Sequence, residues 1–225
     1  MSKLNVAIDG PAGAGKSTVA KLLADKLGLL YIDTGSMYRA LTWKALQLNY
    51  DFNDTAALAE LSSEVMIKLI TDNQNYRVFI DGEDVTGKIR QPEVSQRVSL
   101  VARIPEVRKN MVRQQQSMAA SGGVVMDGRD IGTRVLPDAQ AKFFLTASIE
   151  ERARRRQRDL KQKGYHVPLE TLMAEISQRD YIDQNRETDP LVPAEEAIII
   201  DTTGLTINQV VEQMVQHIEN VSDCK

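Results

Sequence analysis

The stretch Gly10-Pro11-Ala12-Gly13-Ala14-Gly15-Lys16-Ser17 decides the fold. It matches the phosphate-loop pattern G-x-x-x-x-G-K-[ST], in which backbone N–H groups surround phosphate oxygens. An apolar run at residues 4–8 precedes it and a helical pattern at 17–27 follows it, which is the strand–loop–helix context that the motif needs. We therefore expect a nucleoside triphosphate site formed by Gly10, Pro11, Ala12, Gly13, Ala14, Gly15, Lys16, Ser17 and Thr18.

Within this loop, two side chains carry specific chemistry. Lys16 is expected to reach the β- and γ-phosphates, and the Ser17 hydroxyl is expected to hold Mg²⁺. The helix that follows adds a partial positive charge at its N-terminus, which favours bound phosphate. A Gly-rich turn without a ligand is the alternative, and the strand and helix on either side argue against it.

The composition excludes several classes of partner. The chain has 225 residues, 42% of them hydrophobic, and a net charge of −3, which argues against nucleic acid or an anionic membrane as the main partner. Cys224 is the only cysteine, so no disulfide forms within the chain, and a reducing cytoplasm is expected. The first apolar run is too short for a signal-peptide core or a membrane span. We expect a monomer because no conspicuous apolar helix suggests a dimer interface.

Short apolar runs alternate with helical patterns along the chain. This alternation predicts an α/β fold with a parallel sheet flanked by helices. The expected buried strands cover residues 4–8, 29–32, 124–126, 142–145 and 197–200. Asp9, Asp33, Asp127 and Asp201 each follow one of these runs, at the sheet edge where open α/β folds bind their ligands.

Residues 64–103 interrupt this alternation. Runs at 65–70 and 76–80 look like strands joined through residues 72–75, and Asp81-Gly82 reads as a tight turn into a third strand at 83–85. A helix is expected from Pro92 to about Ile104-Pro105. We interpret this segment as a small inserted antiparallel subdomain on one P-loop domain of 225 residues, and an ordinary surface excursion is the alternative.

Arginines follow the predicted strands and line one helix. Arg39 and Arg129 come shortly after strand ends, which favours a ligand site over a structural ion pair. The helix expected at 148–162 carries five arginines. Among them Arg152, Arg155 and Arg156 share one side at i, i+3, i+4 spacing and are the expected phosphate-facing set, whereas Arg154 and Arg158 are expected to point elsewhere.

Two further patterns leave alternatives open. Arg179, Asp183 and Arg186 fall on one helix face, where an intrahelical salt bridge alone would explain the Arg179–Asp183 pair. Asp127 lies where P-loop proteins place an aspartate that orients Mg²⁺ and its water ligands, but it could equally cap the turn Asp127-Gly128.

Several classes of P-loop protein are disfavoured. The chain has no Asn-Lys-x-Asp, the base-reading motif expected of a GTPase, and Met126-Asp127-Gly128 lacks the glutamate expected of an ABC or AAA ATPase. A compact kinase that transfers the γ-phosphoryl group of ATP to a small acceptor remains. This reaction needs mainly positioning and positive charge, and arginine provides both through its planar, two-pronged donor group.

Taken in order, these motifs resemble the nucleoside monophosphate kinases, and specifically the bacterial cytidylate kinases. The resemblance covers essentially the whole chain. It rests on the stretches 8–17, Asp33-Thr34-Gly35 with Tyr38-Arg39, 127–132, 148–153, Arg179-Asp180 with Asp183 and Arg186, and 190–194. It implies transfer of a phosphoryl group from ATP·Mg²⁺ to CMP or dCMP, with an inserted monophosphate-binding subdomain and a short mobile lid at about 148–168.

The resemblance also implies roles for individual residues. Arg39, Arg129 and Arg186 would hold the acceptor phosphate, Ser99, Arg108 and Asp130 would line the cytosine pocket, and Arg179 and Asp183 would reach the ribose. Arg152, Arg155 and Arg156 would belong to the lid over ATP. The expected acceptor-binding set is Asp33, Thr34, Gly35, Tyr38, Arg39, Ser99, Arg108, Arg129, Asp130, Arg179, Asp183 and Arg186. The expected catalytic set is Lys16, Arg129, Arg152 and Arg186, and the expected metal site is Ser17 with Asp127 acting through water.

Base selectivity has a physical basis at Asp130. A carboxylate accepts a hydrogen bond from the exocyclic amine of cytosine but repels the carbonyl that uracil has in its place. Mispaired buried polar groups cost a few kcal/mol, or roughly a hundredfold in selectivity. Two alternatives remain open, namely a kinase for another monophosphate such as UMP, and a switch that binds ATP without an acceptor.

Overall fold

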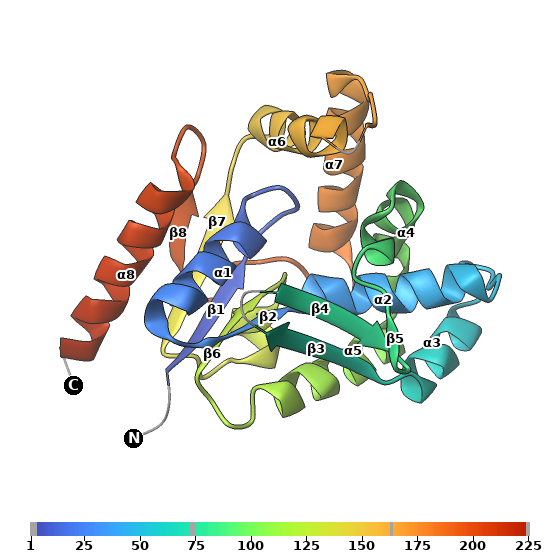
Figure 1. Cartoon of the computed structure of the whole chain (residues 1–225), viewed down its shortest axis with the longest axis horizontal. Coiled ribbons are helices and arrows are strands. Elements are labelled where there is room, and N and C mark those ends of the chain that lie inside the picture. Colours follow the sequence, from blue (N-terminus) through green and yellow to red (C-terminus); the bar gives the residue numbers. More distant parts are fainter. Residues whose placement is uncertain (1–3, 73–74, 163, 224–225) are drawn as a thin grey trace.

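The computed structural model describes residues 4–72, 75–162 and 164–223, and five parallel strands form its central sheet (Figure 1). The strand order is β2-β6-β1-β7-β8. The strands are β1 (Asn5–Asp9), β2 (Leu30–Asp33), β6 (Val124–Asp127), β7 (Ala141–Thr146) and β8 (Ile198–Asp201). β1 lies at the centre, with Ile8 opposite Asp127 on one side and Phe143 on the other.

Helices cover both faces of this sheet, as parallel sheets require. On one face, α1 (Lys16–Leu27) and α8 (Ile207–Asp223) share a core in which Leu23 and Met214 are fully buried. On the other face lie α5 (Pro105–Met118) and a π-helical turn (Ile131–Val135). The prediction of a parallel sheet flanked by helices is confirmed.

The predicted strands match the observed ones to within one or two residues at their ends, but the predicted burial of β8 is wrong. Ile198 and Ile199 are 38% and 62% exposed, and Ile200 is the buried isoleucine of this strand. The reason is position, because β8 is the edge strand and pairs with β7 alone. An apolar run does not reveal whether a strand lies at the centre or at the edge of a sheet.

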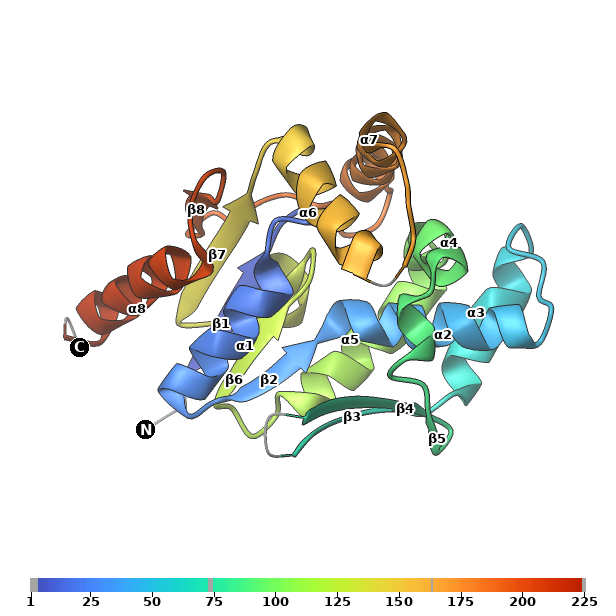
Figure 2. The ribbon, with the colours of Figure 1, turned by 45° about the horizontal axis from the view of Figure 1, so that its top comes forward.

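A second, three-stranded antiparallel sheet lies beside the first (Figures 1 and 2). It consists of β3 (Ile67–Asp72), β4 (Asn75–Ile80) and β5 (Glu83–Asp84), with Ile67 opposite Ile80. The predicted turn forms there, since Asp81 and Gly82 both have positive φ. Residues 73–74 of the predicted β3–β4 connection lie outside the described residues.

Helices around this second sheet share a separate apolar core with it. They are α2 (Thr34–Gln47), α3 (Thr55–Glu64), the 3₁₀ turn η1 (Lys88–Arg90), α4 (Pro92–Ala102) and part of α5. Pro92 and Pro105 occupy first-turn positions of α4 and α5, where the missing N–H costs nothing. The helix predicted to run from Pro92 to about Ile104-Pro105 is α4, which ends at Ala102.

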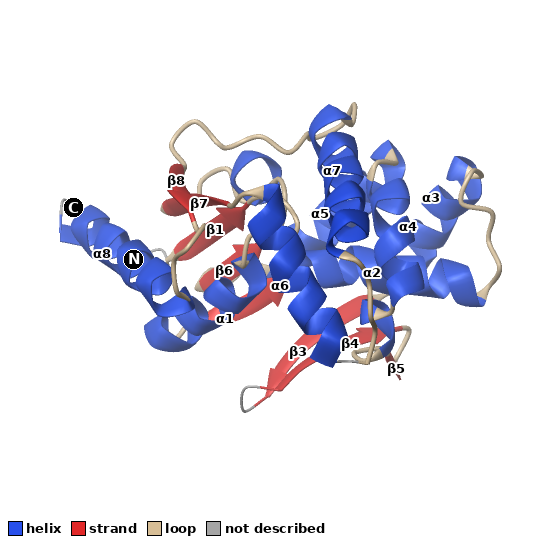
Figure 3. Cartoon of the chain, turned by 90° about the horizontal axis from the view of Figure 1, so that it is seen from above, coloured by secondary structure: helices blue, strands red, loops and turns tan. Residues whose placement is uncertain are grey.

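A helix pair, α6 (Ile149–Gln162) and α7 (Leu169–Asn185), lies above the carboxyl ends of the strands (Figure 3). It has its own small core, which includes Leu160 and Leu172. Ser148 caps α6, because its Oγ accepts a hydrogen bond from the Glu151 N–H at 3.2 Å. Lys163, in the expected break between the helices, and Cys224 lie outside the described residues. In the part of the chain that the structure describes, we find no helix long and apolar enough to cross a membrane.

Candidate active site

The phosphate loop joins β1 to α1 and packs tightly against its surroundings. Gly10 has a φ of 142°, and a Cβ built there would lie 2.0 Å from the carbonyl oxygen of Leu145 on β7. In Figure 2 the loop runs beside the first turn of α6, and a Cβ on Gly13 would lie 3.1 Å from Cβ of Arg152. Position 10 therefore needs glycine for space as well as for backbone conformation, whereas at Gly13 the positive φ of 80° favours glycine and a side chain would be tight against Arg152.

Lys16 begins α1, and its side chain is buried inside the loop. Its Nζ donates a hydrogen bond to the Pro11 carbonyl oxygen at 2.8 Å. Burial lowers the pKa of Lys16, and the nearby Arg129 lowers it further. A bound polyphosphate would favour the charged form, so the site is poised for an anion.

Ser17 and Asp127 meet at the end of β6. The Ser17 hydroxyl donates to Asp127 Oδ2 at 3.0 Å, and the Tyr31 hydroxyl donates to Oδ1 at 2.8 Å. Burial, with Asp33 nearby, raises the pKa of Asp127. The Gly128 N–H donates to the Ile8 carbonyl at 3.0 Å, and both carboxylate oxygens of Asp127 accept from side-chain hydroxyls. A hydroxyl and a carboxylate together supply the oxygen ligands that Mg²⁺ prefers.

A cavity of about 1240 Å³ connects the phosphate loop with the strand-end arginines. It extends from the phosphate loop past Arg129 and Arg39 to α4 and α7. The predicted residues that line it are Ala12, Gly13, Ala14, Gly15, Lys16, Ser17, Thr18, Asp33, Gly35, Arg39, Ser99, Asp127, Arg129, Arg155, Arg156 and Arg179. Residues predicted for a donor and for an acceptor thus share one cavity.

One end of this cavity concentrates positive charge. Arg39, Arg90 and Arg156 surround a hollow of about 140 Å³ that Asp159 and Gln162 complete. Burial lowers the pKa of Arg39 well below its usual value, and its neighbours Arg179 and Arg90 lower it further. An anion bound between these arginines would relieve their repulsion.

Arg90 is a site residue that the sequence patterns do not reveal. Its Nη2 lies 3.2 Å from Asp33 Oδ2, and its side chain is 51% exposed. The Asp33 carboxylate also caps α2 by accepting from the Ser36 N–H at 2.9 Å. Arg90 and Asp33 are 57 residues apart in the sequence, and no local motif around Arg90 predicts this ion pair.

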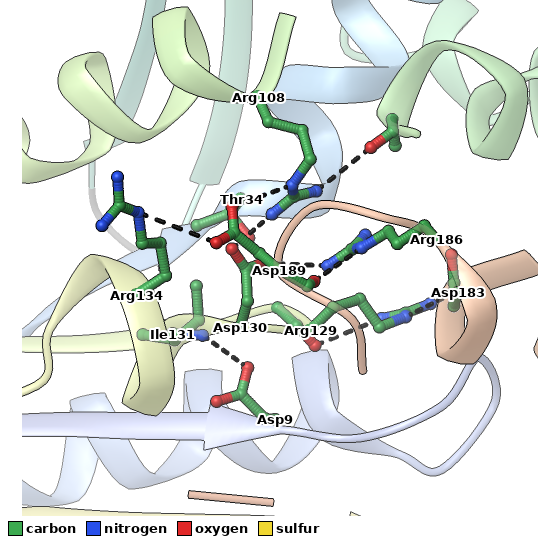
Figure 4. A network of polar contacts seen from close by, with 12 residues as sticks. Asp9, Thr34, Arg108, Arg129, Asp130, Ile131, Arg134, Asp183, Arg186 and Asp189 are labelled. Atoms are coloured by element: carbon green, nitrogen blue, oxygen red, sulfur yellow. Dashed lines mark hydrogen bonds and ion pairs between the residues drawn. The ribbon is translucent and has the colours of Figure 1, made fainter. Parts of the chain in front are cut away.

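The predicted base-pocket residues do not all reach the cavity. Ser99 lines it, whereas Arg108 and Asp130 form a buried ion pair (Figure 4) and do not line it. Burial opposes the charge of Arg108, but Tyr38 and Asp130 outweigh burial and raise its pKa. Arg186 Nη2 lies 3.6 Å from Asp130 Oδ1.

Asp183 pairs mainly with Arg129. Arg129 Nε donates to Asp183 Oδ2 at 2.8 Å, while Arg179 Nε lies 3.9 Å from the same oxygen. The intrahelical Arg179–Asp183 salt bridge is therefore present but secondary. Burial, with Arg129 nearby, lowers the pKa of Arg179 to about 10.

Some of the predicted site residues do not line the cavity. They are Gly10, Pro11, Thr34, Tyr38, Arg108, Asp130, Arg152, Asp183 and Arg186.

The arginines of α6 that face the cavity are not the set that the spacing predicts. Arg152 is buried, donates to the Ala12 carbonyl at 3.1 Å and pairs with Asp180 at 2.7 Å, so it joins the loop to α7. Arg155 donates to Thr202, and Arg156 lines the cavity. The expectation that Arg158 points elsewhere is wrong, because it lines the cavity too. Arg158 is three residues from Arg155, so the two share a face.

Comparisons with known proteins identify a family that the sequence matches. The sequence model of the family described as cytidylate kinase matches residues 6–220. A cytidylate kinase of Desulforamulus reducens is 56% identical over 95% of this chain and 96% of its own length. One from Bacillus subtilis is 52% identical over 98% of both chains.

Solved structures similar to the chain support the fold alone, because their sequences are distant. An uncharacterised protein from Eubacterium ventriosum has a TM-score of 0.54 at 11% identity, over 97% of this chain and 99% of its own. A gluconokinase from Sinorhizobium meliloti has a TM-score of 0.50 at 13% identity, over 98% of this chain and 94% of its own.

Proposed function

The chain belongs to the cytidylate kinase family, and we propose that it transfers the γ-phosphoryl group of ATP to CMP and dCMP, giving CDP and dCDP. The observation that carries this proposal is the single cavity shared by the phosphate loop and a second set of arginines, Arg39, Arg129 and Arg179. A switch that only binds ATP has no use for that second set.

At the donor end, the glycine-rich loop presents backbone N–H groups to the phosphates of ATP. Lys16 places its charge on the β- and γ-phosphates. Ser17 and Asp127 would hold Mg²⁺, which neutralises charge on the phosphate oxygens when it is bound. Arg155, Arg156 and Arg158 on α6 face the same cavity and add positive charge around the transferring group.

At the acceptor end, Arg39 and Arg129 bind the phosphate of the monophosphate, and Arg90 joins them. Arg39 is already oriented, because its Nη1 donates to Ser95 Oγ at 2.8 Å. The attacking group is an ionised phosphate oxygen, so no general base is needed. Catalysis then rests on alignment and on charge neutralisation between two anions.

Base recognition falls to Ser99, Arg108 and Asp130. Because the Arg108–Asp130 pair is buried and does not line the cavity, the base must enter beside Ser99, and the wall there must open to the pair. Asp130 then accepts from the exocyclic amine of cytosine. Arg179 lines the cavity, and we assign it with Asp183 to the ribose and Arg186 to the acceptor phosphate.

The same proposal assigns parts to the fold. Residues 64–103 act as the monophosphate-binding subdomain and residues 148–168 as a lid, within one domain that works as a cytoplasmic monomer. A lid matters because a kinase that admits water hydrolyses ATP without transfer. Arg152, which joins the phosphate loop to α7, is the residue through which lid closure would reach the donor site.

The deciding experiment measures ADP release from ATP·Mg²⁺ with CMP, dCMP, UMP, AMP, GMP or no acceptor. We expect turnover with CMP and dCMP and far less with the others. Turnover with a different monophosphate would keep the kinase but overturn the roles of Ser99, Arg108 and Asp130. Turnover without any acceptor would contradict the kinase proposal.

A further inference from the structure

Asp189, which the functional proposal does not yet use, lies at the centre of a network of polar contacts (Figure 4). It precedes Pro190 in the segment that follows α7. Its φ of 48° is unusual for a residue with a side chain, and such strain persists where surrounding contacts fix it. Its carboxylate and its carbonyl hold three arginines.

Asp189 holds two arginines through two different groups. Its carboxylate Oδ2 accepts from Arg108 Nε at 3.1 Å. Its backbone carbonyl accepts from Arg186 Nε at 2.6 Å. A third arginine, Arg134 in the π-helical turn, places Nε 3.7 Å from the other carboxylate oxygen. One residue therefore ties together α5, the π-helical turn and the end of α7.

The same two arginines face Asp130. Arg108 Nη2 pairs with one carboxylate oxygen of Asp130, and Arg186 Nη2 lies 3.6 Å from the other. Arg108 is 1% exposed, and its remaining nitrogen donates to the Ala102 carbonyl at 3.1 Å. Each of the three nitrogens of Arg108 thus has a partner, and these three contacts fix the orientation of the guanidinium.

We infer that Asp189 positions Arg108, and through it Asp130, for recognition of the acceptor base, while its carbonyl holds Arg186 for the acceptor phosphate. It does not line the cavity and its carboxylate accepts from Arg108, so we place it in contact with Arg108 and not with the base. Its charge also matters, because the buried Asp130 and the partly buried Asp189 together balance the buried guanidiniums of Arg108 and Arg186. Loss of one carboxylate leaves an excess of buried positive charge, which would draw Asp130 away from the base.

This inference rests on the proposed function, since it concerns how the chain selects cytosine. It adds a residue from outside the cavity wall, contributed by the segment beyond α7. The contact between Asp189 and Arg108 spans 81 residues, so no local pattern in the sequence reveals it.

Two variants separate the contribution of the Asp189 carboxylate and its charge from that of the backbone carbonyl. Asp189→Gly keeps the left-handed backbone and the carbonyl that holds Arg186, but removes the carboxylate. Asp189→Asn also tolerates positive φ and keeps an acceptor oxygen, but removes the charge. Glu187→Gln is the matched control, because it removes an exposed carboxylate of the same segment.

The measurement is kcat/KM for CMP and for UMP, with the KM for ATP and the melting temperature as checks on folding. We expect Asp189→Gly to lower the CMP-to-UMP ratio by about tenfold, as the loss of a charge-assisted hydrogen bond implies. Asp189→Asn should fall between this variant and the wild type. The KM for ATP in both Asp189 variants should stay within about twofold of wild type, because a purely structural defect would change this constant as well. The CMP-to-UMP ratio in Glu187→Gln should also stay within about twofold of wild type.

A double variant tests the route of action. If Asp189 works through the pair at Asp130, then Asp189→Gly should change the ratio little when Asp130→Ala is already present. An unchanged ratio in folded Asp189→Gly and Asp189→Asn would overturn the inference while leaving the proposed function intact. A wild-type chain that does not prefer CMP to UMP would overturn the cytidine-specific function and this inference with it.

Discussion

The Ser17 hydroxyl donates a hydrogen bond to Asp127 Oδ2 at 3.0 Å, across 110 residues of sequence. It joins the first turn of α1 to the carboxyl end of β6. A second donor, the Tyr31 hydroxyl, occupies the other oxygen of Asp127. The phosphate loop is thereby fixed to the sheet at the place where we propose that Ser17 and Asp127 would hold Mg²⁺.

Replacing Asp127 should therefore change the metal dependence of the reaction. In Asp127→Asn, we expect the Mg²⁺ concentration for half-maximal rate to rise about tenfold or more, because an amide is a weaker ligand than a carboxylate. ADP release during Mg²⁺ titration at fixed ATP and CMP measures it. Asp201→Asn is the control, since Asp201 also ends a strand but does not line the cavity. Identical titrations in both variants would exclude Asp127 from the metal site.

Arg90 is expected to bind the acceptor and not the donor. Removing an arginine that binds a phosphate costs roughly 1.5–3 kcal/mol, or about ten- to hundredfold. Because Arg90 is half exposed, we expect the lower part of that range as a rise in the KM for CMP in Arg90→Ala, with the KM for ATP unchanged. Arg103→Ala, an exposed arginine at the end of α4, should change neither constant. A rise in the KM for ATP alone would assign Arg90 to the donor.

Residues 148–168 should exchange amide hydrogens more slowly when both substrate sites are filled. The helix pair has a small core of its own, and it meets the phosphate loop through Arg152, so it can close as a unit. Hydrogen exchange with and without a bisubstrate analogue measures this, with α8 as the internal reference. Equal exchange in 148–168 with and without the analogue would contradict a moving lid.

What the sequence can predict depends on whether the signal is local. The phosphate loop is contiguous, so spacing alone assigns Lys16 and Ser17, and the strand-end positions of Arg39 and Arg129 correctly predict that both reach the cavity. Apolar runs locate the strands of the main sheet, because buried parallel strands have a continuous apolar pattern.

Contacts between distant segments cannot be predicted in this way. Arg90 meets Asp33, and Asp189 meets Arg108, only because the fold brings separate elements together. Helical spacing also cannot decide how a helix is rotated against its neighbours. For this reason spacing directs Arg158 away from the site although it lines the cavity, and it does not reveal that Arg152 is buried against Asp180.

Gly10 should be intolerant of any side chain. Its Cβ would lie 2.0 Å from a backbone oxygen of β7, which cannot move without breaking the sheet. We expect Gly10→Ala to lower the free energy of unfolding by more than about 3 kcal/mol. Gly28→Ala is the control, since Gly28 also has positive φ but a Cβ added there would meet no atom within 4 Å, and it should cost roughly 1–2 kcal/mol. Urea unfolding compares the two, and equal losses would show that conformation alone, not space, requires glycine at position 10.

Asp9 should make the chain less stable as the pH rises from about 4 to 7. Its carboxylate accepts hydrogen bonds from the Ile131 and Gly132 N–H groups, each at 2.8 Å. Burial outweighs these bonds and raises its pKa from 3.8 to about 6. Between these values the folded chain keeps a proton that the unfolded chain has lost, so stability is highest below pH 3.8 and is lost as the pH passes 6.

Comparison with Asp9→Asn isolates this contribution from those of the other carboxylates. The difference in unfolding free energy between wild type and variant should fall by about 3 kcal/mol from about pH 4 to about pH 7, following roughly 1.4 kcal/mol per pKa unit. Urea unfolding at a series of pH values measures it. Asp84→Asn should give the opposite sign and only below about pH 4, because hydrogen bonds from Thr86 lower the pKa of Asp84. A difference between wild type and Asp9→Asn that stays constant across this range would mean that Asp9 is charged throughout it in the folded chain.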